Sequence, residues 1–298
     1  MPTPALTTAP REHVMSGAVT QLQMSVPPLA SRRALLGSAA VIAGNFCLGE
    51  ASAATAATRL PSKDDVLIYV GAGCFWHVQH EMTVAEQALL GRDGNSFTAV
   101  AGYAGGNKLG KDGKVCYHNM AFDSDYGSFG HTEVVAVQVP ADAVEGFVTA
   151  YVDLFDKSGV RHDPQDQGGE YRSALGLPGG VKNEKSMRVL TEAAAKKGMT
   201  VVAGKGDEGD TLRDRTIFVY DTTQFPFHAG ELYHQYHNDM TENYGKKYNA
   251  LRDSKATEGA LAISKCPGDA KLTGVFASGD FASSGIFDGF FQDKSVND

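Results

Sequence analysis

Apolar positions between residues 66 and 220 switch repeatedly between the spacing of strands and that of helices. Residues 66–71 form a short apolar run ending in glycines, which predicts a buried strand. Residues 74–90 carry apolar side chains at the spacing of an amphipathic helix. Further strands are predicted at residues 98–102, 133–139, 200–203 and 216–220, and further helices at residues 141–155, 181–197 and 230–243.

The order of these elements predicts an α/β (α+β) domain. Strand, helix, strand, strand, helix and a final strand match a split βαβ layout, in which helices cover one face of a sheet. Residues after about 254 are rich in Gly, Ser and Asp and are expected to lie over the surface as a tail.

Residues 1–58 have the character of a removable targeting segment. The pair Arg32-Arg33 precedes a modest apolar run at residues 34–48, and Ala51-Ser52-Ala53 then forms a small-residue cleavage signature. The arginine pair suggests twin-arginine export, and the long stretch before it suggests a plastid transit peptide joined to a thylakoid-lumen signal. A bacterial periplasmic leader is the alternative, as is a short surface helix with a chance arginine pair. We expect the mature chain to begin near Ala54.

Composition narrows the classes of function. The 298 residues carry a formal net charge of -8 and no basic stripe with interleaved aromatics, which argues against a nucleic-acid partner. The apolar run in the leader is too short and too rich in Gly and Ala to span a membrane, so no membrane partner is expected. The four cysteines, at 47, 74, 116 and 266, contain no CxxC pair, which disfavours a paired-thiol zinc site and leaves thiol catalysis open.

Cys74 is the leading candidate for a nucleophile. It follows a strand and two glycines and opens the predicted helix, where unpaired N–H groups and the helix dipole stabilise an anion. This position is expected to lower the pKa of the thiol. The alternative for this residue is a buried structural cysteine.

Five segments, in order over about residues 66–240, resemble the type A peptide methionine sulfoxide reductases. Such ordered agreement is far more specific than a single tetrapeptide. The segments are Gly73-Cys74-Phe75-Trp76, Gly102-Tyr103-Ala104-Gly105-Gly106, Gly130-His131-Thr132-Glu133-Val134-Val135, His162-Asp163-Pro164 with Gly168-Gly169-Glu170-Tyr171-Arg172-Ser173, and Glu231-Leu232-Tyr233-His234-Gln235. The resemblance implies a ferredoxin-like two-layer sandwich over residues 59–253, with 254–298 as a flexible tail.

The resemblance also implies roles for five polar residues. Cys74 matches the nucleophile that attacks sulfur, and Glu133 matches the proton donor, as a partly buried carboxylic acid can be. Tyr103 and Tyr171 match phenols that hydrogen-bond the sulfoxide oxygen. Asp166 stands five residues before Tyr171, at the spacing of the family's supporting aspartate.

Phe75 and Trp76 match the apolar wall that binds the substrate's methyl group. Three departures from the family pattern flank this pocket. His77 stands where the family usually has Gly, Gln165 alone remains of a longer loop, and residues 116–130 form a longer stretch than usual.

The implied reaction reduces methionine S-sulfoxide, free or in proteins, through a sulfenic acid on Cys74. No cofactor is expected beyond a thioredoxin-type dithiol, and a monomer is expected. Cys266, in the Gly- and Asp-rich tail, is the predicted resolving thiol. Cys116 and direct attack by an external thiol are the alternatives.

Two other classes of function stay open. One is a non-catalytic binding protein that retains the fold, and the other is a redox- or metal-sensing thiol protein. His77 and His80 follow Cys74 at helical spacing, but these residues do not complete a four-coordinate set, so no metal is predicted.

Overall fold

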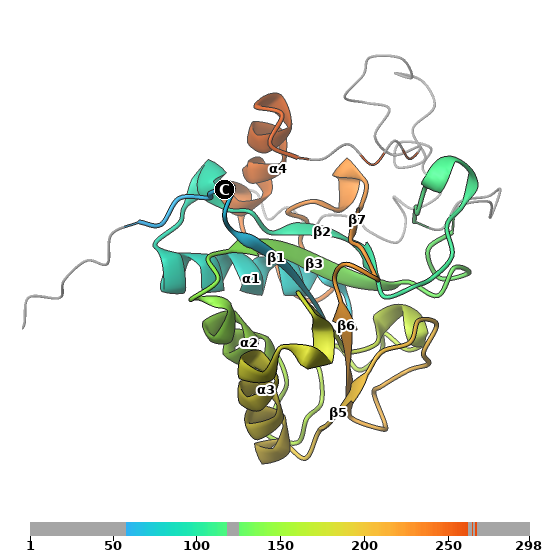
Figure 1. Cartoon of the computed structure of the whole chain (residues 1–298). Helices are drawn as coiled ribbons and strands as arrows, with labels where there is room; N and C mark the ends of the chain where they lie inside the picture. Colours follow the sequence, from blue (N-terminus) through green and yellow to red (C-terminus); the bar gives the residue numbers. More distant parts are fainter. Residues whose placement is uncertain (1–57, 118–124, 262–263, 265, 267–298) are drawn as a thin grey trace, which may run out of the picture. The chain divides into compact units, whose positions relative to one another are not determined.

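The computed structural model describes residues 58–117, 125–261, 264 and 266, and these contain one seven-stranded mixed sheet and four α-helices (Figure 1). The predicted mixed α/β class is confirmed. The strands are β1 (Val66–Gly71), β2 (Val100–Ala104), β3 (Thr132–Val139), β4 (Ala174–Leu177), β5 (Thr200–Ala203), β6 (Thr216–Asp221) and β7 (His228–Ala229). The helices are α1 (Phe75–Leu90), α2 (Val144–Asp153), α3 (Glu184–Lys196) and α4 (Lys246–Thr257).

The centre of the sheet has the predicted split βαβ arrangement. The strand order is β5-β6-β4-β1-β3-β2-β7. β1 pairs antiparallel with β3 and β4, and β3 pairs antiparallel with β2, so β3 lies between the two strands that α1 connects. β6 and β5 extend the β4 edge with parallel pairing, and β7 extends the β2 edge.

Side chains alternate between the two faces of the sheet, and each face carries its own hydrophobic cluster. Ile68 and Val70 of β1 face the cluster that also contains apolar residues of α1, α2 and α3. Tyr69, between them, faces the opposite side, where Phe225 and Phe227 pack instead of a helix. Figure 1 shows α1, α2 and α3 side by side along the sheet.

Helix α1 is held at both ends. Cys74 is its N-cap residue, and Gly91 ends it with a φ of 65°, the left-handed conformation that favours glycine. Arg92, fully buried, then pairs with Glu86 at 2.8 Å and with Asp65 at 2.9 Å. These pairs tie the end of α1 to the start of β1.

Several predicted boundaries differ from the structure. Residues 230–243 were expected to be helical, but only Leu232–His234 forms a single 3₁₀ turn. The reason is that the side chain of Gln235 binds the backbone N–H and C=O of Ala101 in β2, at 2.9 Å each, which holds this segment against the sheet edge in an extended form. Strands β4 and β7 were not predicted.

The fold also continues past residue 253, where the sequence placed the end of the domain. α4 runs to Thr257, and the buried Lys255 donates from Nζ to the carbonyls of Asn95 and Phe97. The predicted targeting segment lies outside the described residues, except for residue 58, and most of the predicted tail lies outside them too. Within the described part of the chain, no helix combines the length and the apolar character that a membrane span needs.

Candidate active site

Two glycines form the tight turn between β1 and α1 that positions Cys74. A Cβ at Gly71 would lie 2.6 Å from the backbone oxygen of Glu133, so only glycine fits there. Gly73 has a φ of 87°, and a Cβ on it would lie 3.1 Å from Arg161 Cδ. The chain therefore turns sharply between β1 and α1 and leaves Cys74 partly exposed at the helix N-terminus.

Glu133 lies buried beside that turn, 2% exposed, on β3. Its Oε2 accepts a hydrogen bond from the Phe75 backbone N–H at 2.9 Å, and its Oε1 accepts one from the Tyr126 hydroxyl at 3.3 Å. Burial raises the pKa of Glu133 well above its usual range, and the charge of nearby Asp166 adds to this. Burial therefore favours the protonated form of this carboxyl, and its role as a proton donor remains a prediction.

The thiol departs from the sequence prediction of a lowered pKa. Burial raises the pKa of Cys74 well above its usual value, and a negative charge on Glu133 would raise it further, whereas the facing backbone N–H of Trp76 acts in the opposite sense. The direction of this shift favours the neutral thiol over the thiolate.

Asp166 joins this group from the loop before β4. Its carboxyl faces the backbone N–H of Cys74, and burial together with the charge of Asp163 raises its pKa to about 6. Oδ2 is buried and accepts no hydrogen bond from the described residues. The backbone oxygen of Asp166 is bound by Arg161, which fixes the loop.

Four tyrosines surround Glu133, and they differ in what their hydroxyls contact. Burial raises the pKa of Tyr171, and the nearby Glu133, Asp166 and Cys74 raise it further, so this tyrosine lies close to all three. Tyr103 pairs directly across from Glu133 in the β2–β3 register, but its hydroxyl donates to Glu231 Oε2 at 2.7 Å.

Sequence reasoning missed Tyr117 and Tyr126. Tyr126 is fully buried, stacks on Tyr103 with ring centroids 4.6 Å apart, and donates to Glu133. Tyr117 stacks on Tyr126, and its pKa is raised by burial, by the charge of Glu133 and by a hydrogen bond with Tyr171. Both come from the unusually long stretch 116–130, whose two tyrosines were the available signal.

The predicted apolar wall is present and is extended by histidines. Phe75 and Trp76 are 1% and 6% exposed. Trp76 stacks on His237 with centroids 4.3 Å apart, and Phe75 lies 5.0 Å from the ring of His234. The segment that the sequence predicted as a helix thus supplies the far side of this wall.

Arg172 holds three of the family-like motifs together. It is 1% exposed and donates from Nη2 to the carbonyls of Gly105 and Gly130, and from Nη1 to that of Gly169. Its Nε donates to the Tyr220 hydroxyl at 2.8 Å. Because one buried guanidinium binds loops from three segments, it fixes the positions of Tyr103, Glu133 and Tyr171 relative to one another.

The disulfide in this structure joins Cys116 to Cys266, and Cys74 is the free cysteine of the described residues. Cys266 was predicted to resolve Cys74, with Cys116 as the alternative. The Cys74–Cys266 link remains a prediction for an oxidised intermediate. Cys116 immediately precedes the pocket residue Tyr117, so this disulfide lies next to the site in sequence.

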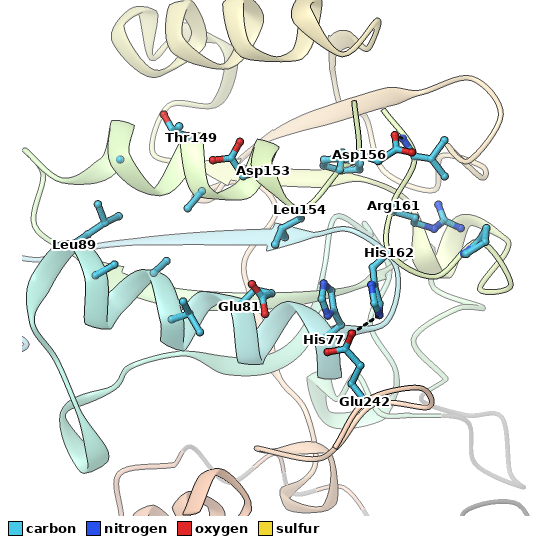
Figure 2. Close-up of a pocket in the computed structure, with 18 residues that line it drawn as sticks. His77, Glu81, Leu89, Thr149, Asp153, Leu154, Asp156, Arg161, His162 and Glu242 are labelled. Carbon is cyan, nitrogen blue, oxygen red and sulfur yellow. Dashed lines mark hydrogen bonds and ion pairs between the residues drawn. The ribbon is translucent and has the colours of Figure 1, made fainter. Parts of the chain in front are cut away.

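A large groove lies beside the site, and Cys74 is not among the residues that line it. It has a volume of about 940 Å³ and runs between α1 and α2, with Leu89 at one end and His77 and His162 at the other (Figure 2). A second, small cavity of about 10 Å³ is lined by Cys74 together with the same two histidines. Of these two cavities, only the small one is lined by the nucleophile candidate Cys74.

Comparison with known proteins finds no matching family model and no matching curated protein. Among solved structures, the chain is similar to methionine sulfoxide reductase A of Corynebacterium diphtheriae, with a TM-score of 0.38 and 19% identity over 58% of this chain and 74% of that one. It is also similar to Mxr1 from Saccharomyces cerevisiae in reduced form, with a TM-score of 0.37 and 19% identity over 60% and 86%. The unusual oxidized form of Mxr1 gives a TM-score of 0.30 and 18% identity over 70% and 91%. At TM-scores this low the likeness says nothing about chemistry, so function must be inferred from the site.

Proposed function

We propose that this protein reduces methionine S-sulfoxide, free or in proteins, with Cys74 as nucleophile and Glu133 as proton donor. The observation that supports this most directly is geometric: the buried carboxyl of Glu133 accepts the Phe75 backbone N–H at the first turn of α1, next to Cys74 at the N-cap. Burial raises the pKa of both groups, which favours a neutral thiol beside a neutral carboxylic acid. A sulfoxide reductase needs these two groups together, because sulfur must be attacked while its oxygen is protonated.

The reaction follows from the positions of the groups. The sulfur of Cys74 attacks the sulfoxide sulfur while Glu133 gives its proton to the sulfoxide oxygen. The thiol proton of Cys74 returns to Glu133, and the oxygen ends on Cys74 as a sulfenic acid while methionine leaves. In this proposal Tyr171 donates to the polarised oxygen, whereas Tyr126 donates to Glu133 and orients its carboxyl.

Recycling requires a second thiol. The sulfenic acid condenses with a cysteine thiol, releasing water and forming a disulfide, and a thioredoxin-type dithiol then reduces that disulfide. In the state described, Cys116 and Cys266 are bonded to each other and offer no free thiol. This pair must therefore be reduced before Cys266, or Cys116 in its place, can resolve Cys74.

The decisive test is an assay of a methionine sulfoxide peptide with dithiothreitol, using the wild-type chain and Cys74→Ser. We expect the wild type to form methionine and the Ser variant to form none, with an unchanged circular dichroism spectrum. Turnover by Cys74→Ser at the wild-type rate would contradict the proposal. A folded wild type without activity would favour a binding or thiol-sensing protein.

The disulfide gives a second, stoichiometric test without reductant. A chain without the predicted leader, and so without Cys47, should form about one methionine while the Cys116–Cys266 disulfide is intact, since only Cys74 can then be oxidised. The fully reduced chain should form about two, because two further thiols can accept oxidation. Equal yields from the two preparations would show that Cys116 and Cys266 take no part in recycling.

A further inference from the structure

Two histidines and an aspartate from three separate segments meet at the rim of the pocket. His77 comes from α1, His162 from the loop after α2, and Asp239 from the segment before α4. One donor atom from each lies within 4.8 Å of the other two. Asp239 Oδ2 is 3.4 Å from His162 Nε2 and 3.9 Å from His77 Nδ1.

These separations are close to those of ligand atoms around a small metal ion. Ligands bound to zinc at about 2.0–2.2 Å in tetrahedral geometry lie roughly 3.3–3.6 Å from each other. The imidazole rings of His77 and His162 are stacked with centroids 3.9 Å apart, so both must rotate for their nitrogens to converge. The χ2 torsion of histidine has a broad distribution, so this rotation costs little free energy.

A carboxylate oxygen of Glu242 is near enough to act as a fourth ligand. Glu242 Oε1 is 3.9 Å from His162 Nε2, and Figure 2 shows this contact at the end of the large groove. The carboxylate of Glu242 is half-exposed and free to adjust, and a water molecule could take the same position. Two imidazoles with one or two carboxylates form a donor set that suits zinc.

His80 does not belong to this cluster, although the sequence grouped it with His77. Its Nδ1 lies 2.8 Å from Glu81 Oε1, and its ring stacks on Tyr244 with centroids 3.9 Å apart. The helical spacing therefore selected one ligand of the cluster, and the other two come from residues far away in sequence.

The cluster stands between the groove and the thiol. His77 and His162 line both the large groove and the small cavity, and Asp239 and Cys74 line the small cavity. A cavity of about 10 Å³ is close to the size that admits one water-sized particle. An ion bound here would occupy the space in front of Cys74.

We propose that His77, His162 and Asp239 form a binding site for a divalent transition-metal ion, with zinc the best match, and that the bound ion shields Cys74. The binding itself is independent of the proposed reductase function. If the protein is a sulfoxide reductase, shielding of Cys74 by zinc should also inhibit it, and this consequence rests on the proposed function. The site would make access to the thiol depend on the free concentration of metal.

The first experiment measures zinc binding to the full chain by calorimetry. Asp239→Asn keeps the acceptor oxygen for the Thr241 and Glu242 backbone N–H groups but removes the anionic ligand. We expect this variant and His162→Gln to weaken binding by at least about tenfold, since even outer-shell partners of metals contribute that much. His80→Gln, on the same helix as His77, is the matched control and should bind as the wild type does.

Cys74→Ser separates a histidine–aspartate site from a thiol site. Zinc binding that persists in this variant supports the assignment, and binding that disappears would overturn it, because the thiol would then hold the ion. Unchanged affinity in both Asp239→Asn and His162→Gln would overturn it as well.

The second experiment follows alkylation of Cys74 by iodoacetamide, with peptide mapping. Zinc should slow the modification in the wild type and in His80→Gln but not in Asp239→Asn. Equal protection in Asp239→Asn would contradict shielding by this site. The measurement needs no sulfoxide reduction, so failure of the metal site and failure of the proposed function give different results.

Discussion

Glu86 and Glu133 are both almost completely buried, yet their surroundings are opposite. The side chain of Glu86 is 0% exposed, pairs with Arg92, and accepts hydrogen bonds from the backbone N–H groups of Thr98 and Ala99. Glu133 accepts hydrogen bonds from Phe75 and Tyr126, faces other carboxyl groups, and is paired with no cation in the described part of the chain.

Under the proposed function, the difference separates a structural carboxylate, Glu86, from a reactive acid, Glu133. A buried charge is tolerated when a cation and N–H donors replace its water, as they do for Glu86. Where they do not, the carboxyl retains its proton, as the raised pKa of Glu133 indicates. Burial alone identifies neither role, whereas the presence of an arginine partner distinguishes them.

The substitution Glu133→Gln tests most directly whether the two glutamates differ in this way. Glutamine has nearly the same shape but no proton to transfer, so we expect sulfoxide reduction to fall by about 10²–10⁴-fold. The free energy of unfolding should change by no more than about 1 kcal/mol, because a neutral group replaces a neutral group. Steady-state kinetics and urea unfolding provide the two measurements.

The pH dependence of the wild type sharpens this test. Glu133 acts as an acid only while protonated, so the rate should fall as pH rises through its raised pKa. Glu133→Gln should lack that decrease. A wild-type profile that stays flat at high pH would assign proton donation to another group.

Glu86→Gln should show the reverse pattern. Removing one partner of a buried ion pair leaves Arg92 with its charge only partly compensated, which costs about 3–5 kcal/mol of stability. Activity per folded molecule should remain at the wild-type level. The midpoint of urea unfolding checks the first statement, and activity normalised to folded protein checks the second. A catalytic loss as large as that of Glu133→Gln would contradict the assigned roles.

How far the sequence predicted the molecule also differs between regions. The strand–helix junction at Cys74 was predicted well, because the apolar run of β1 and the helical spacing of α1 are local patterns. The segment 230–243 was not, because Gln235 is fixed by β2, which is distant in sequence. β4 was missed because its four residues include a glycine and precede a proline.

The site was predicted in part for the same reason. Cys74, Glu133, Asp166 and Tyr171 are brought together, as the resemblance implied, and their roles remain predictions. The pKa of the thiol is raised chiefly by burial, which depends on distant segments packing around Cys74 and which no local pattern reveals. The cluster at His77 likewise depends on folding rather than on spacing.

Substitutions of two tyrosines test which hydroxyl supports Glu133, with a smaller expected loss of rate. Tyr126→Phe removes the hydroxyl that donates to Glu133, and a hydrogen bond between neutral groups is worth about 0.5–1.5 kcal/mol, or roughly 2–10-fold in rate. Tyr103→Phe removes a bond to Glu231 instead and should reduce the rate less. Comparison of kcat/KM for the two variants decides the order, and a larger loss for Tyr103→Phe would restore the role predicted from the sequence.

Asp166 is intermediate between the two glutamates, and its effect should be the smallest. Burial raises its pKa in the folded state to about 6, above the ordinary value of an aspartate, so the folded state binds this proton more tightly than the unfolded state. The resulting stabilisation is fully present below about pH 4 and is lost as pH rises through about 6. Asp166→Asn does not titrate, so its stability relative to the wild type should increase between those pH values. The size should be on the order of 1 kcal/mol, because solvent screens this partly exposed group. Thermal unfolding of both proteins at pH 4 and pH 7 measures the difference. A relative stability that instead decreases with pH would mean that Asp166 is held as a carboxylate, as Glu86 is, and belongs with the structural carboxylates.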